Sequence, residues 1–128
     1  MSVPENSPAS DLSLRDLARF AEGEARRIAA TFGFDPTTRD GRASFALSQA
    51  VKLGEEVGEL HAEVLGALEF QRRDKAGRYS RDTLAGELAD VMVCVALLAD
   101  SFGVDLTQAL ESKIEHLEAR KGQNEITG

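Results

Sequence analysis

Apolar residues recur every three or four positions along most of the chain, the spacing of amphipathic α-helices. This periodicity predicts helices over about 14–32, 44–68 and 81–102, and a fourth that follows a capping Asp105 and ends near 121. The segment 35–42 holds Pro and Gly and is expected to be a loop. Since short connections join long helices, the sequence predicts an all-α fold, an antiparallel four-helix bundle.

The chain has the length of one domain, with 128 residues. We expect a flexible tail at 1–12, a single helical domain over 13–122 and a short C-terminal tail at 123–128. The basic loop 72–81, which carries Arg72, Arg73, Lys75 and Arg78, connects the second and third helices. It is either a solvated loop or a mobile lid over a phosphate group, and the sequence leaves both interpretations open.

The third predicted helix is apolar on nearly all sides, because Asp90 is the only polar side chain between Leu88 and Ala99. A helix of this kind is normally buried. Its second face, formed by Met92, Val93, Ala96 and Leu97, lacks a full covering in a lone four-helix bundle. Exposed apolar faces mark interfaces. We therefore expect a homo-oligomer, either a homodimer or a homotetramer.

Two acidic clusters suggest the chemistry: Glu55, Glu56 and Glu59 on the second helix, then Glu87 and Asp90 on the third. A carboxylate on a buried helix is costly, and neighbouring carboxylates raise one another's pKa. Glu56 and Glu59, like Glu87 and Asp90, are spaced i, i+3 and share a helix face. Two facing pairs form a four-carboxylate box, which suits Mg²⁺ or Mn²⁺ because these ions prefer oxygen ligands.

The acidic residues have two other possible interpretations. Ordinary solvated helix faces would explain Glu55 and Glu63, but they explain Asp90 poorly. A carboxylate-bridged di-iron site needs Glu-x-x-His on two helices. Neither histidine fits, because Gly58 precedes His61 by three residues and Lys113 precedes His116 by three.

Composition narrows the partners and the location. A net charge of −7 argues against nucleic acid and against an anionic membrane as the main partner. A phosphate-bearing substrate remains compatible, since a bound metal ion reverses the local charge. One cysteine, Cys94, excludes an intramolecular disulfide and suits a reducing cytoplasm, and no apolar run reaches membrane-spanning length. A cytoplasmic location is expected.

The acidic motif stands as Glu55-Glu56-x-x-Glu59 followed by Glu87-x-x-Asp90, and its flanks are 52–60, 86–91 and 103–106. With these flanks, the chain resembles the MazG-like branch of the all-α nucleoside triphosphate pyrophosphohydrolases. The resemblance covers about 47–120. It implies hydrolysis of a nucleoside or deoxynucleoside triphosphate between the α- and β-phosphates, giving a monophosphate and pyrophosphate, in a role such as nucleotide-pool cleaning.

The resemblance also assigns roles to individual residues. It makes Glu56, Glu59, Glu87 and Asp90 the ligands of Mg²⁺, with Mn²⁺ as a substitute, and it gives Glu55 a general-base role towards the attacking water. Lys113 and Arg120 match cationic positions that meet substrate phosphates, although Arg120 also fits a basic turn that complements the helix dipole. Lys52, one turn before Glu56, either pairs with the carboxylates or reaches a phosphate. Leu117 stands where relatives often carry Asn, so the preferred base is left open.

The sequence leaves two competing functions open. Phosphoribosyl-ATP pyrophosphatase shares the acidic framework and cleaves the same type of bond, but it typically has His and aromatic residues where this chain has 91–94. A non-catalytic metal-binding or regulatory bundle belongs to a different class, and it predicts metal binding without turnover.

Overall fold

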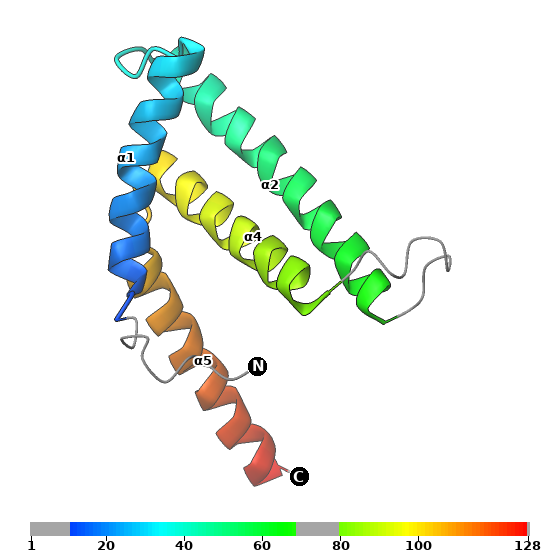
Figure 1. The fold of residues 1–128 in the computed structure, drawn as a ribbon. Coiled ribbons are helices and arrows are strands. Elements are labelled where there is room, and N and C mark those ends of the chain that lie inside the picture. Colours follow the sequence, from blue (N-terminus) through cyan, green and yellow to red (C-terminus); the bar gives the residue numbers. More distant parts are fainter. Residues whose placement is uncertain (1–10, 69–79, 128) are drawn as a thin grey trace.

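The computed structural model describes residues 11–68 and 80–127, and within them the chain forms four helices and no strand (Figure 1). The helices are α1 (Leu14–Phe32), α2 (Arg39–Ala67), α4 (Arg81–Ser101) and α5 (Leu106–Thr127). The all-α prediction is confirmed, and the helix packing fits a bundle. None of the described helices combines the length and apolarity needed to cross a bilayer. The expected tail up to residue 10 and most of the basic loop, 72–79, lie outside the described residues.

Helices α1 and α4 begin at capping boxes, and both have the predicted bounds to within one residue. The Ser13 hydroxyl accepts a hydrogen bond from the backbone N–H of Asp16 at 3.2 Å, while the Asp16 carboxylate accepts one from the Ser13 N–H at 2.9 Å. Ser80 and Thr83 repeat this exchange at the same two distances. Each box satisfies backbone donors that the first helical turn leaves without partners.

Helix α2 begins five residues earlier than the periodicity suggested, at Arg39 instead of near Ser44. The Thr38 hydroxyl accepts a hydrogen bond from the Gly41 N–H at 3.0 Å, so Thr38 is the N-cap. Asp40 adds a negative charge in the first turn, where the helix dipole favours it. The part of the expected loop after Thr38 is therefore helical, and Gly41 is one of its first helical residues.

The end of α5 also differs from the prediction, because the helix continues past Lys121 and Gly122 to Thr127. A glycine ends a helix when it takes a left-handed conformation. Gly33 and Gly103 do so, with φ values of 76° and 63°, and Gly122 does not. Inside a helix a single glycine costs only about 1 kcal/mol relative to alanine, so α5 passes through it.

The core lies where α1, the start of α2 and the C-terminal half of α4 meet. Its buried residues are small, apart from one aromatic ring and one leucine: Ala21, Ala25, Phe45, Ala96 and Leu97. Phe45 also meets Phe34 edge to face, with ring centroids 5.5 Å apart. α4 packs against both α2 and α1, whereas α5 contacts α1 and projects away from the other helices (Figure 1).

The residues predicted to form the uncovered face of α4 are only partly correct. Ala96 and Leu97 are buried in the chain's own core, and Val93 packs against that core. The side of α4 left open carries Leu88 and Met92, which are 49% and 54% exposed. Thus α4 is covered by α1 and α2 but stays open on the side that carries Leu88 and Met92.

Gly41 offers a test of the α1–α2 connection. A Cβ at this position would lie 2.0 Å from the backbone oxygen of Asp35, far inside any real contact distance. Gly41→Ala should therefore lower the free energy of unfolding by about 1–3 kcal/mol, measured by urea denaturation. Gly23→Ala is the matched control, because a Cβ on Gly23 in α1 would meet nothing within 4 Å. The control should gain about 0.5–1 kcal/mol, and equal effects of the two substitutions would contradict the close approach.

Candidate metal centre

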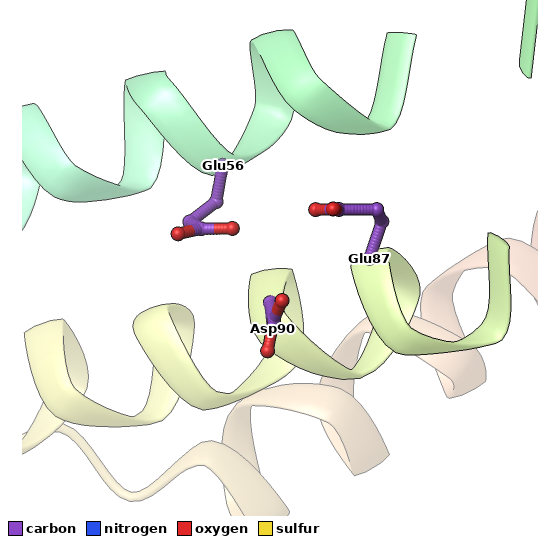
Figure 2. A group of neighbouring side chains, drawn as sticks. All are labelled: Glu56, Glu87 and Asp90. Carbon is purple, nitrogen blue, oxygen red and sulfur yellow. The ribbon is translucent and has the colours of Figure 1, made fainter. Parts of the chain in front are cut away.

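The side chains of Glu56, Glu87 and Asp90 converge between α2 and α4. Figure 2 shows Glu56 pointing from α2 towards α4, Glu87 extending from α4 into the space between the two helices, and Asp90 on the neighbouring turn of α4. One carboxylate oxygen from each residue lies within 4.8 Å of the other two. We call these three residues the carboxylate triad. Within the described residues it is the group of potential metal ligands that the fold brings together.

Glu56 occupies a position where the helix pattern favours an apolar residue. The buried face of α2 runs through Phe45, Gln49 and Glu56, at spacings of four and seven residues, and it faces α4. Glu56 is only 9% exposed. Its Oε1 atom lies 3.4 Å from Lys52 Nζ, one turn earlier on the same helix. Glu56 thus brings a negative charge into the α2–α4 contact.

Two oxygens of the triad are buried without a hydrogen-bond partner among the described residues. They are Glu56 Oε2 and Glu87 Oε2. A buried, unpartnered carboxylate oxygen is costly and calls for an explanation, such as a bound ion. This observation is independent of the mere proximity of acidic residues, and it makes the triad a candidate cation site.

The electrostatics of the site oppose the ionisation of Glu87. Burial raises the pKa of Glu87, and the charges of Glu59, Asp90, Glu56 and Glu63 raise it further, in that order. The pKa of the Cys94 thiol is also raised, first by burial and then by the charge of Glu56. Negative charge is therefore in excess around the triad, and a divalent cation would relieve it.

The triad can close around such a cation if its side chains rotate inwards. With Mg–O distances of about 2.1 Å, two bound oxygens lie about 4.2 Å apart on opposite sides of the ion and about 3.0 Å apart on adjacent sides, and at most one pair among three can be opposite. The three clustered oxygens lie within 4.8 Å of one another, so metal binding needs contractions of up to roughly 2 Å. The donor set consists entirely of carboxylate oxygens, which suit Mg²⁺ or Mn²⁺.

The burial expected at Asp90 is wrong. Asp90 is exposed, while the deeply buried carboxylate is Glu56 on the neighbouring helix. The physical reason is that Asp90 lies at the solvent-exposed edge of the α2–α4 contact, whereas Glu56 lies within it. The buried charge that led us to expect a cation is real, but it belongs to α2.

Glu59 and Glu55 lie beside the triad and not within it. Both are exposed. Glu59 has no oxygen among the clustered atoms, although its charge raises the pKa of Glu87. The charge of Glu55 contributes to raising the pKa of Lys52. Both carboxylates are therefore near enough to act on the site electrostatically.

Lys113 and Arg120 are exposed on α5, which packs on α1 rather than along the α2–α4 pair that carries the triad (Figure 1). Of the predicted phosphate-binding residues, Lys52 is the one that the structure brings into contact with the triad.

A contact that the sequence analysis missed lies at the end of the site. The Thr83 hydroxyl donates a hydrogen bond to Glu63 Oε2 at 2.9 Å, and it joins the C-terminal part of α2 to the first turn of α4. Glu63 follows Glu56 by seven residues and so shares its helix face. That spacing was visible in the sequence and could have identified Glu63 as a second acidic residue facing α4.

The raised pKa of Glu87 gives a pH-dependent prediction for the protein in a chelator. The unfolded chain ionises this carboxyl near its ordinary value of 4.5, and the folded chain ionises it at higher pH. As pH rises from 4.5 through the folded value, the folded state holds more protons, so stability falls. Glu87→Gln escapes this loss. It should be more stable than the unsubstituted chain at pH 7, with the difference disappearing below about pH 4.5.

The free energy of unfolding of Glu87→Gln and of the unsubstituted chain is measured by urea denaturation at pH 4 and pH 7. Glu111→Gln, an exposed acid on α5, is the control and should change stability little at either pH. A Glu87→Gln variant that is less stable at pH 7 would contradict the electrostatic picture of the triad.

Comparison with known proteins adds no relative. No protein-family model, no curated protein and no solved structure matches this chain. The interpretation of the site therefore depends on its geometry and on the acidic motif.

Proposed function

We propose that the chain is a metal-dependent pyrophosphohydrolase, which hydrolyses nucleoside or deoxynucleoside triphosphates to a monophosphate and pyrophosphate. The observation that carries the metal site is the buried, unpartnered oxygen of Glu56 facing Glu87 and Asp90. The substrate class comes from the resemblance of the acidic motif to the MazG-like enzymes. The geometry of the triad supports metal binding directly, and the acidic motif supports the substrate class.

In this proposal Glu56, Glu87 and Asp90 hold Mg²⁺, and Glu59 turns in to join them. When bound, the ion would stabilise the negative charge on the phosphates and would lower the pKa of a water molecule. Glu55 accepts the proton of that water as its oxygen bonds to the α-phosphorus. The bond from the α-phosphorus to the bridging oxygen then breaks, and pyrophosphate leaves with its electron pair.

We also propose that the active form is a homodimer or homotetramer in which α2 and α4 run antiparallel. The juxtaposition of Glu63 with Thr83 and of Glu56 with Asp90 supports the antiparallel pairing. Assembly is supported by two sets of exposed apolar residues: Leu110, Ile114 and Leu117 along one face of α5, and Leu88 and Met92 on α4. Placing α5 of one copy on α4 of another would cover both sets.

The same arrangement would complete the site. Lys113 lies on α5, close in sequence to its exposed apolar residues. Docking of α5 onto a second copy would therefore bring Lys113 and Arg120 towards the triad of that copy. Within one chain these cations lie apart from the triad, which favours the rival proposal of a metal-binding bundle without turnover if the chain does not assemble.

The products test the reaction. With Mg²⁺ and each of the eight common (d)NTPs, at least one should yield a monophosphate and pyrophosphate, separated by ion-exchange chromatography. A chelator should abolish turnover. Asp90→Asn should lower kcat by about 10²-fold or more, as expected for loss of a metal ligand. It should also weaken Mn²⁺ binding, measured by calorimetry.

Glu111→Gln again serves as the control and should leave both activity and Mn²⁺ binding unchanged. A diphosphate and orthophosphate as primary products would refute the proposed bond cleavage. Metal binding without hydrolysis of any of the eight nucleotides would instead support the non-catalytic bundle.

Mixed oligomers test the shared site. Asp90→Asn and Lys113→Ala chains should each have little activity alone. Refolded together in equal amounts, they should recover about a quarter of wild-type activity, because half of the dimers then contain one site with all its residues intact. Light scattering should report at least twice the chain mass of 13.8 kDa.

Met92→Glu places a charge on the exposed side of α4 and should lower both the mass and the activity. Leu97 is unsuitable for this test, because it is buried in the core. A fully active monomer would contradict the proposed assembly.

A further inference from the structure

The ammonium of Lys52 is the cation that touches the carboxylate triad. Lys52 Nζ lies 3.4 Å from Glu56 Oε1, and no other ion pair of the described residues involves a member of the triad. The two partners differ in burial. The Glu56 side chain is 12% exposed, whereas that of Lys52 is 57% exposed. The carboxylate is therefore fixed between the helices, and the ammonium sits at the edge with room to move.

The surroundings keep Lys52 charged. A hydrogen bond to Glu56 and the charge of that carboxylate raise the pKa of Lys52, and Glu55 adds a smaller effect in the same direction. At neutral pH the site thus contains one permanent monovalent cation. It pairs with Glu56 through Oε1 only, since Oε2 has no hydrogen-bond partner among the described residues.

We propose that Lys52 is the internal counter-ion of the metal-free site, and that a divalent cation displaces its ammonium from Glu56 towards a phosphate oxygen of the substrate. A divalent ion bound to Glu56 repels the ammonium and competes with it for the same carboxylate. The lysine stem is long and flexible, and its exposed head can rotate away without disturbing the helix contact. The inference deepens the proposed function and depends on the metal site described there.

This exchange couples the metal to the substrate. Lys52 weakens metal binding in the free protein, because the metal must displace it. A phosphate that holds the ammonium removes this competition, so the substrate strengthens metal binding and the metal strengthens substrate binding by the same factor. The protein would therefore bind its metal weakly when alone and tightly together with a triphosphate.

The claim that Lys52 weakens metal binding is tested by calorimetry, with Mn²⁺ titrated into the full chain after treatment with a chelator and dialysis. Lys52→Met should bind Mn²⁺ about threefold to tenfold more tightly than the unsubstituted chain, because the competing charge is gone. Lys52→Gln should behave in the same way, while Lys52→Arg, which keeps the charge, should stay near the original affinity. Lys121→Met is the matched control, since Lys121 pairs with Glu118 at 3.2 Å on exposed α5. It should change nothing.

The transfer of the Lys52 ammonium to a phosphate oxygen is tested with the Mn²⁺ complex of inorganic triphosphate. This complex is titrated into protein that is already saturated with Mn²⁺. This probe carries the phosphates without a base. Lys52→Met should bind it about tenfold more weakly than the unsubstituted chain, and Lys52→Arg should bind it nearly as well. Tighter metal binding together with weaker triphosphate binding is the signature of an ammonium that moves from one partner to the other.

The outcomes separate this inference from the proposed function. If the unsubstituted chain binds no Mn²⁺, the metal site and the inference both fail. If it binds Mn²⁺ and Lys52→Met binds it equally or more weakly, the metal site stands and the counter-ion role is overturned. If metal binding tightens while triphosphate binding stays the same, the transfer to the phosphate is overturned. Circular dichroism melts of each variant confirm that the fold is retained.

Discussion

The burial of one carboxylate, that of Glu56, is the constraint that shapes the rest of this molecule. An apolar side chain at this position would pack between α2 and α4 at no electrostatic cost. Instead, the contact contains a charge with one oxygen paired to Lys52 and the other unpaired. Glu87 adds a second unpaired oxygen from the facing helix. Such a contact is poor for stability on its own, and the proposed divalent cation would offset its electrostatic cost.

The two halves of helix α4 have different roles. Its C-terminal half contributes Ala96 and Leu97 to the core, where they meet the small residues Ala21 and Ala25 of α1. Its N-terminal half presents Glu87 and Asp90 to α2. The core is thus concentrated at one end, and the other end can accommodate carboxylate repulsion without loosening it. Cys94, buried between these two regions, marks the point where apolar packing gives way to charge.

Local signals in the sequence were sufficient for most helix bounds. Periodic apolar positions located the starts of α1 and α4 in the sequence, and the structure adds the capping boxes of Ser13 and Ser80 that fix these starts. The i, i+3 spacing of Glu87 and Asp90 likewise predicted that these side chains lie close together. Periodicity gives the angles between residues on one helix, but it does not say which neighbour covers each face. For that reason the sequence assigned the buried charge to Asp90 rather than Glu56 and placed Leu97 on an outer face. Whether α5 lies against the triad of its own chain is also a long-range property, which no local pattern encodes.

The turn between α4 and α5 sets the direction of the whole of α5. Gly103 takes its left-handed φ of 63° there, and Val104 N–H donates to the Ala99 carbonyl at 2.9 Å, so the direction of α5 is set within a few residues. The helix that follows has 22 residues and is about 33 Å long. A rotation of only about 10° at this turn would swing the far end by roughly 6 Å, and Arg120 by about twice as far as Lys113. A substitution in this turn that rotates α5 would therefore shift Lys113 and Arg120 while leaving the carboxylates of the triad in place.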